Sequence, residues 1–85
     1  MDRLTADMNM GSNLRLLRKK HKYTQDRLVA RLGIFGVSTT RSLYSRYETG
    51  ELNIPVRLLV ALHMIYGCSY DAFFEGLELE NTDTL

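Results

Sequence analysis

The chain has 85 residues, the length of one domain, and 45% of them are hydrophobic, which is normal for a folded protein and argues against disorder. A single cysteine, Cys68, excludes an intramolecular disulfide and a cysteine-rich zinc site. The sequence has no apolar run near the roughly 18 residues of a membrane span and no recognisable signal peptide, so we expect a soluble cytoplasmic protein.

The charged residues are segregated along the chain, although the net charge is only +1. Between residues 15 and 46 there are nine basic residues and one acid, Asp26. From Asp71 onward every charged residue is acidic. A basic half of this kind favours a polyanionic partner, but a solvated basic surface would have the same composition.

Helical periodicity begins after residues 1–9, which show no clear period and are predicted to form a flexible lead-in. A first helix is predicted from about Gly11 or Ser12 to Lys22, with an apolar face formed by Leu14, Leu17 and His21. Its basic end, "RKKHK", suits a nucleic-acid patch, and equally suits cations favoured by the dipole at a helix C-terminus.

A second helix is predicted to begin after Thr24, whose side chain can cap an amide of the first turn. Its apolar stripe consists of Leu28, Val29 and Leu32. Gly33 and Gly36 then flank an apolar connector, which we expect to end the stripe and turn the chain.

The segment "TRSLYSRYETG" predicts a third helix, capped by Thr40 and stopped by Gly50 in the left-handed conformation. At 100° per residue, an arc of about 140° holds polar side chains alone. This polar arc contains Arg41, Ser42, Ser45 and Arg46. Leu43, Tyr44 and Tyr47 fall on the opposite side and are expected to face the core. Solvated helix faces usually mix acids with bases, so the lack of acids suggests a partner.

A fourth helix is predicted after Pro55, which suits a first helical turn. Its apolar stripe is Leu58, Leu59, Leu62, Ile65 and Tyr66. After Gly67, Ser69 is expected to cap a short last helix with Phe73 and Phe74 as buried anchors, closed by Gly76. No strand pattern or repeat appears, so an all-α domain of five short helices is predicted.

Four segments, "TQDRLVARL", "LYSRYETG", "NIPVRLLVAL" and "YGCSYDAFF", resemble in the same order the phage repressor and Cro-type (XRE-like) helix-turn-helix family. The resemblance implies a compact five-helix lambda-repressor-like domain whose third helix enters the DNA major groove. We expect this domain at residues 10–76, followed by an acidic tail, residues 77–85. The turn "GIFGVSTT" is about five residues longer than the common pattern, as in a subset of the family; residues 33–37 form the insertion.

The resemblance also implies which residues contact DNA. At the start of the second helix the family grips a phosphate with amides and a glutamine side chain, an arrangement that the helix N-terminus favours. The third helix contacts bases; there Arg41 is favoured for a guanine, whereas Arg46 suits a base or a phosphate. A loop at residues 49–53 contacts the backbone. The expected DNA-binding residues are Thr24, Gln25, Thr40, Arg41, Ser42, Ser45, Arg46 and Asn53.

Other polar residues have structural interpretations. Arg18 and Glu48 match a pair that commonly forms a salt bridge between the first and third helices, which we prefer to a catalytic role for Glu48. His63 and Cys68 are expected to be packing residues. No spacing suggests a nucleophile–base pair, a metal site or a phosphate-binding glycine loop, so we expect no enzyme, cofactor, metal or small-molecule substrate.

The leading hypothesis is therefore a sequence-specific transcriptional regulator that binds double-stranded DNA. Because one recognition helix contacts few base pairs, we expect a homodimer on a two-fold site. The apolar residues expected at its interface are Phe73, Phe74, Leu77 and Leu79. The alternative is a protein-interaction module on the same fold, such as an antitoxin or a phage adaptor.

Overall fold

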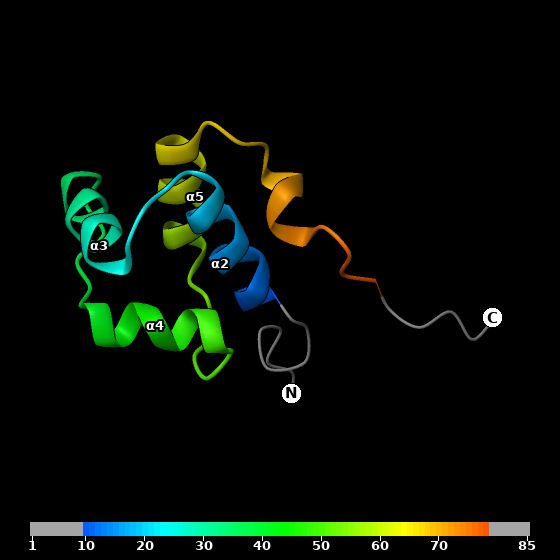
Figure 1. Ribbon diagram of the computed structural model, residues 1–85, viewed down its shortest axis with the longest axis horizontal. Coiled ribbons are helices and arrows are strands. Elements are labelled where there is room, and N and C mark those ends of the chain that lie inside the picture. The colour runs from blue at the N-terminus through cyan, green and yellow to red at the C-terminus, as the bar shows by residue number, and fades with distance from the viewer. Residues whose placement is uncertain (1–9, 79–85) are drawn as a thin grey trace, which may run out of the picture.

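The computed structural model describes residues 10–78, which form four α-helices and one short 3-10 helix around a single core (Figure 1). These elements are α2 (Met10–Lys20), α3 (Gln25–Ile34), α4 (Arg41–Thr49), α5 (Val56–Tyr66) and η1 (Tyr70–Phe74). No strand occurs within this range. The predicted all-α architecture is confirmed, but the count differs slightly from the predicted five helices, because the last element of residues 10–78 is a short 3-10 turn. None of the helices in residues 10–78 has the length and apolarity to cross a membrane.

The helix ends follow the capping residues of the sequence. The Thr24 side chain accepts a hydrogen bond from the Arg27 amide at 3.1 Å, and α3 begins at the next residue. The Thr40 side chain accepts one from the Leu43 amide at 3.1 Å. Gly50 has a φ of 85°, a left-handed conformation that glycine adopts without a steric cost and that ends α4. The caps expected at these three positions are confirmed.

Two helix boundaries differ from the prediction. The first helix ends at Lys20 rather than Lys22, because Lys22 adopts a positive φ of 63° that no right-handed helix allows. The second helix continues through Gly33 to Ile34, so Gly33 lies within α3 and not at its end. The chain turns instead at Gly36, where φ is 85°.

The lengthened turn after α3 is packed against the domain. Phe35 and Val37 lie partly buried against the core. The Val37 amide also donates a hydrogen bond to the Leu32 carbonyl at 2.9 Å, which folds the turn back on the end of α3. The six residues between α3 and α4 therefore make apolar contacts with the core as well as joining the two helices.

The core takes buried side chains from all five elements. Its members are Leu14, Leu28, Leu32, Tyr44, Leu58, Ala61, Leu62, Tyr66 and Phe73. Of the buried side chains expected in the last helix, Phe73 is fully enclosed, whereas Phe74 is about half exposed. In a 3-10 helix consecutive side chains diverge by about 120°, so two neighbouring phenylalanines cannot both enter one core.

The side of α4 that faces the core also differs from the predicted one. Leu43 was expected to face the core but is 41% exposed, while Tyr44 and Glu48 are buried. These two residues lie four positions apart on one face of the helix. The rotation follows from Glu48, which turns inward to meet Arg18 of α2.

Two sets of contacts attach η1 and α4 to α2. Asn13 donates hydrogen bonds of 2.9 Å to the carbonyls of Phe73 and Glu75, which fasten η1 to α2. Gly11 lies directly against the backbone carbonyls of Tyr47 and Glu48 at the end of α4. The position of α4 on the molecule is therefore set by close backbone contact with α2.

Candidate nucleic-acid interface

The polar arc of α4 is accessible in the folded chain. Arg41 and Arg46 have 66% and 51% of their side-chain surface exposed. Ser42 is also exposed, and Ser45 is partly buried. All four line one hollow together with Gln25 of α3. In Figure 1, α4 runs along an outer edge of the molecule, where a partner can approach it.

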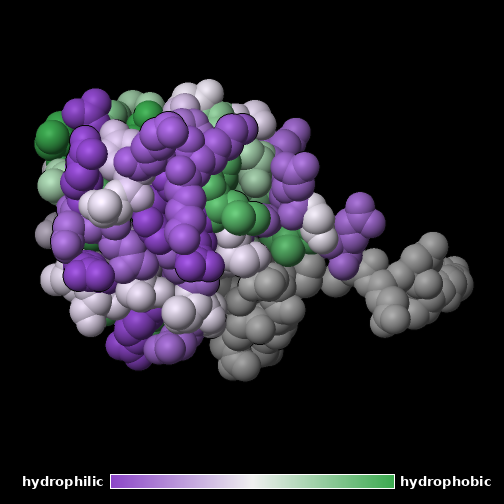
Figure 2. Space-filling view, viewed as in Figure 1, coloured by the Kyte–Doolittle hydropathy of each residue, from purple (hydrophilic) through white to green (hydrophobic). Residues whose placement is uncertain are grey.

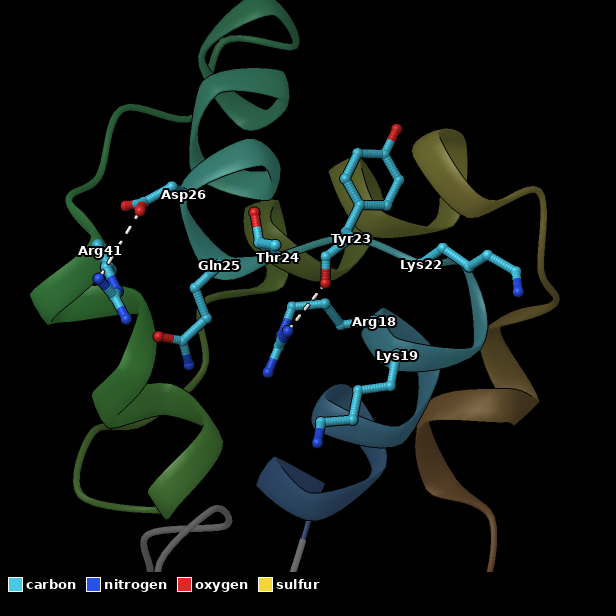
Figure 3. A pocket seen from close by; sticks show the side chains of 8 residues that line it. All are labelled: Arg18, Lys19, Lys22, Tyr23, Thr24, Gln25, Asp26 and Arg41. Atoms are coloured by element: carbon cyan, nitrogen blue, oxygen red, sulfur yellow. Dashed lines mark hydrogen bonds and ion pairs between the residues drawn. The ribbon is translucent and has the colours of Figure 1, made fainter.

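A second hollow lies beside the first, at the start of α3 (Figure 3). It is lined by Arg18, Lys19, Lys22, Tyr23, Thr24, Gln25, Asp26 and Arg41. Gln25 and Arg41 line both hollows, which makes the two continuous. Basic side chains around a helix N-terminus suit an anion, because the first amides of the helix and its dipole favour negative charge.

A buried ion pair underlies the junction between the two hollows. Arg18 donates hydrogen bonds to both Glu48 oxygens, from Nε at 2.7 Å and from Nη2 at 3.1 Å. The Arg18 and Glu48 side chains are only 9% and 4% exposed. Arg18 also donates to the Tyr23 carbonyl at 2.9 Å, so a single guanidinium links α2, the loop before α3, and α4.

The Glu48 carboxylate also positions Gln25. Gln25 Nε2 donates a hydrogen bond to Glu48 Oε1 at 3.1 Å, and Figure 3 shows the Gln25 side chain between Arg18 and Arg41. Burial opposes ionisation of Glu48, but the hydrogen bonds it accepts, chiefly from Arg18, lower its pKa below the ordinary value. The carboxylate therefore stays charged and keeps both partners in place.

Two exposed acids pair with the arginines of the polar arc. Asp26 Oδ2 lies 3.7 Å from Arg41 Nη1, and Glu51 Oε1 accepts a hydrogen bond from Arg46 Nε at 3.1 Å. Neither acid was among the site residues expected from the sequence. The signal was present in principle, because Asp26 is the lone acid of the basic segment and Glu51 follows Arg46 by five residues.

The remaining expected DNA contacts lie around this surface. Thr24 lines the hollow at the start of α3, but its hydroxyl oxygen already caps that helix. The Thr40 hydroxyl likewise caps α4, immediately before Arg41. Asn53 is exposed in the loop between α4 and α5 and is not among the residues that line either hollow. Lys19 and Lys22, which belong to the basic segment "RKKHK", also line the hollow at the start of α3, as does Tyr23, which sequence reasoning had not singled out.

The face shown in Figure 2 is mainly hydrophilic, and a small apolar area appears on it between α2 and η1. A hollow at this place is lined in part by Leu16, Leu17 and Ala72, and Leu16 is 65% exposed. This apolar area is separate from the basic surface formed by α3 and α4.

The histidine and cysteine of the C-terminal half are packing residues in the structure. The His63 ring stacks on Tyr70 with centroids 4.1 Å apart, and its Nδ1 lies 2.6 Å from the Cys68 carbonyl. Burial raises the pKa of the Cys68 thiol above its ordinary value, which favours the neutral form. Residues 10–78 contain no group of three or more metal-ligating side chains of the His, Cys, Asp and Glu types.

Two short helices joined by a turn, with an exposed basic arc on the second and a basic hollow at the start of the first, define a helix-turn-helix protein. The model of the helix-turn-helix family matches residues 14–73, well over half of the chain. The chain therefore belongs to this family, in its Cro/repressor or XRE type, and is a DNA-binding regulator. No curated protein and no solved structure matches the chain at a significant level.

Proposed function

We propose that the chain is a sequence-specific transcriptional regulator that places α4 in the major groove of double-stranded DNA. The observation that carries the proposal is the accessible arc of Arg41, Ser42, Ser45 and Arg46, gathered with Gln25 around one hollow. An arginine can donate to both O6 and N7 of guanine, while serines contact several bases without strict preference. The arginines of the arc can thus discriminate between bases, while its serines can contact bases without discriminating between them.

The hollow at the start of α3 is proposed to receive a phosphate of the DNA backbone. It is lined by Lys19, Lys22 and the first residues of α3, and the amides of a helix N-terminus favour an anion. Gln25 has a second amide hydrogen besides the one donated to Glu48, and this hydrogen is available for a phosphate oxygen. Such a contact carries no sequence information, but it fixes the depth and angle at which α4 enters the groove.

We further propose that two copies bind a two-fold site, because one recognition helix contacts only a few base pairs. Phe74 and Leu16 supply exposed apolar surface at the η1 end of the molecule, away from the basic hollows. The expectation that Phe73 contributes to this interface is wrong, because that side chain is fully buried in the core. Leu77 is partly buried, and Leu79 lies outside the described residues.

Replacing Arg41 by alanine tests the proposed contact with bases. For a duplex selected from random DNA, we expect the preference over a scrambled duplex to fall about 5- to 150-fold, equivalent to about 1–3 kcal/mol. Affinity measured by fluorescence anisotropy across a salt series should fall steeply with salt for the wild type, because counterions are released on binding.

Arg57→Ala is the matched control, because Arg57 is also exposed but lines a different hollow, beside Tyr47 and the lengthened turn. This variant should keep the sequence preference of the wild type. Equal losses of sequence preference in the two variants would show that Arg41 contributes general electrostatic attraction and not recognition of a base. A wild type that binds no duplex even at low salt, and that co-purifies with a protein in fixed stoichiometry, would favour the interaction-module function instead.

A further inference from the structure

The acids of residues 10–55 are distributed in an unusual way. This segment contains three acids, Asp26, Glu48 and Glu51, and each forms an ion pair with an arginine. Glu48 is buried with Arg18 and has a structural role. The other two are 71% and 59% exposed, and they pair with the two arginines of the polar arc. Exposed acids on a DNA-binding surface oppose binding in general, so their placement beside these arginines needs a reason.

Stability is a weak explanation for the two exposed pairs. Both arginines keep at least half of their side-chain surface in solvent, and ion pairs of this kind contribute little to folding. The Asp26–Arg41 separation of 3.7 Å is also longer than a hydrogen bond. These acids are therefore more relevant to what the arginines bind than to the stability of the fold.

The geometry of Arg46 shows how an acid can orient an arginine without blocking it. Glu51 accepts from Nε, which leaves the edge formed by Nη1 and Nη2 free in the described structure. This edge can still donate two parallel hydrogen bonds to guanine O6 and N7. Glu51 comes two residues after the end of α4, and its own amide donates to the Arg46 carbonyl at 2.9 Å, so the acid is fixed close to its partner.

Asp26 lies beside Arg41 in a different way, 3.7 Å from Nη1 of the guanidinium rather than hydrogen-bonded to Nε. It lies in the first turn of α3, and Figure 3 shows its carboxylate facing the Arg41 guanidinium across the gap between α3 and α4. A DNA phosphate that approached Arg41 would also approach this carboxylate and be repelled by it. A guanine edge carries no net charge, so it meets no such repulsion.

Lys19 and Lys22 provide the contrast. Both line the basic hollow at the start of α3, and within residues 10–78 neither forms an ion pair with an acid. Asp26 and Arg41 line the same hollow, but this acid is paired with Arg41 and with neither lysine. The lysines therefore have no carboxylate paired with them, whereas the arginines of the arc each have one.

We propose that Asp26 and Glu51 are specificity-determining residues, which orient Arg41 and Arg46 toward bases and make their surroundings unfavourable for phosphate. This inference rests on the proposed function, since it assigns a role within sequence-specific DNA binding. The two acids weaken binding to DNA of any sequence more than they weaken binding to the selected site. They thereby widen the difference between the two affinities, which is the quantity that a regulator needs.

The test compares the wild type with Asp26→Asn, Glu51→Gln and the double variant. Affinities are measured for a duplex selected from random DNA with the wild type, and for a scrambled duplex of the same composition. We expect the double variant to bind the scrambled duplex about tenfold more tightly and the selected duplex no more than about threefold more tightly. The ratio of the two affinities should fall accordingly, with each single variant giving part of the effect.

The double variant Asp71→Asn/Glu78→Gln is the matched control. It removes the same two charges from exposed acids of η1 and the segment after it, away from α4. Its ratio should equal that of the wild type. A ratio in the Asp26→Asn/Glu51→Gln variant that matches this control, or rises, overturns the inference while leaving the proposed function intact. A wild type that enriches no sequence from random DNA contradicts the proposed function itself, and the inference with it.

Discussion

Replacing Arg18 by methionine is expected to destabilise the domain by about 3–5 kcal/mol, the usual cost of breaking a buried ion pair. Glu48 would remain in a site where only 4% of its side chain meets solvent. It would keep the single hydrogen bond from Gln25 and lose the two from Arg18. Chemical denaturation with urea, followed by circular dichroism, measures the change in the free energy of unfolding.

The double variant Arg18→Met/Glu48→Leu separates the ion pair from the loss of either charge alone. With both charges removed, the site becomes apolar, and we expect a smaller loss of stability than the sum of the two single variants. A single Arg18→Met variant that costs less than about 1 kcal/mol would contradict this description, because surface pairs give values of that size.

The pH dependence of stability provides an independent readout of the same pair. The pKa of Glu48 is lowered in the folded state from an ordinary value of 4.5. A group with a lowered folded pKa stabilises the fold fully above its unfolded pKa, and this contribution is lost as pH falls through the folded pKa. Stability should therefore decrease below about 4.5, and Glu48→Gln should show a flatter dependence in this range. An unchanged slope in that variant would show that other carboxylates dominate.

Replacing Gly11 by alanine is the second substitution for which we expect a large effect. The added Cβ would lie 2.6 Å from the Tyr47 carbonyl oxygen and closer still to that of Glu48. Both obstacles are backbone atoms, which cannot rotate away as a flexible side chain can. Overpacking of this kind typically costs about 1–3 kcal/mol, and we expect the upper end of that range. The C-terminal end of α4 should also shift away from α2.

Gly33→Ala is a matched control within the same domain. Gly33 also lies inside a helix, but an added Cβ meets no atom within 4 Å. Alanine is favoured over glycine inside a helix by about 0.5–1 kcal/mol, so this variant should be neutral or more stable. Thermal unfolding of the two variants under identical conditions gives the comparison. Equal melting temperatures would contradict the close contact between α2 and α4.

Much of the fold was predictable because it depends on residues close in sequence. The caps at Thr24, Thr40 and Gly50 act over three or four residues, so a helix boundary can be derived from a short window. The polar arc of α4 likewise follows from helical periodicity alone. The exposure of Arg41 and Arg46 agrees with that pattern.

The features that could not be predicted arise from contacts between distant segments. Helical periodicity placed Leu43 inward, but the pairing of Glu48 with Arg18, thirty residues away, rotates the buried side of α4. The tight fit at Gly11 depends on where the end of α4 lies. The pairing of Asp26 with Arg41 depends on how the lengthened turn places α4 beside α3. No local pattern encodes these distances.

The proposed function requires that the polar arc of α4 contacts base edges in the major groove. Methylation interference on the selected duplex tests it most directly, because methylation of guanine N7 blocks an arginine from that edge. We predict that methylation of one or two guanines per half-site prevents binding of the wild type, and that Arg41→Ala becomes indifferent to one of them. The claim would be contradicted by interference at no guanine N7, or by identical patterns for the wild type and this variant.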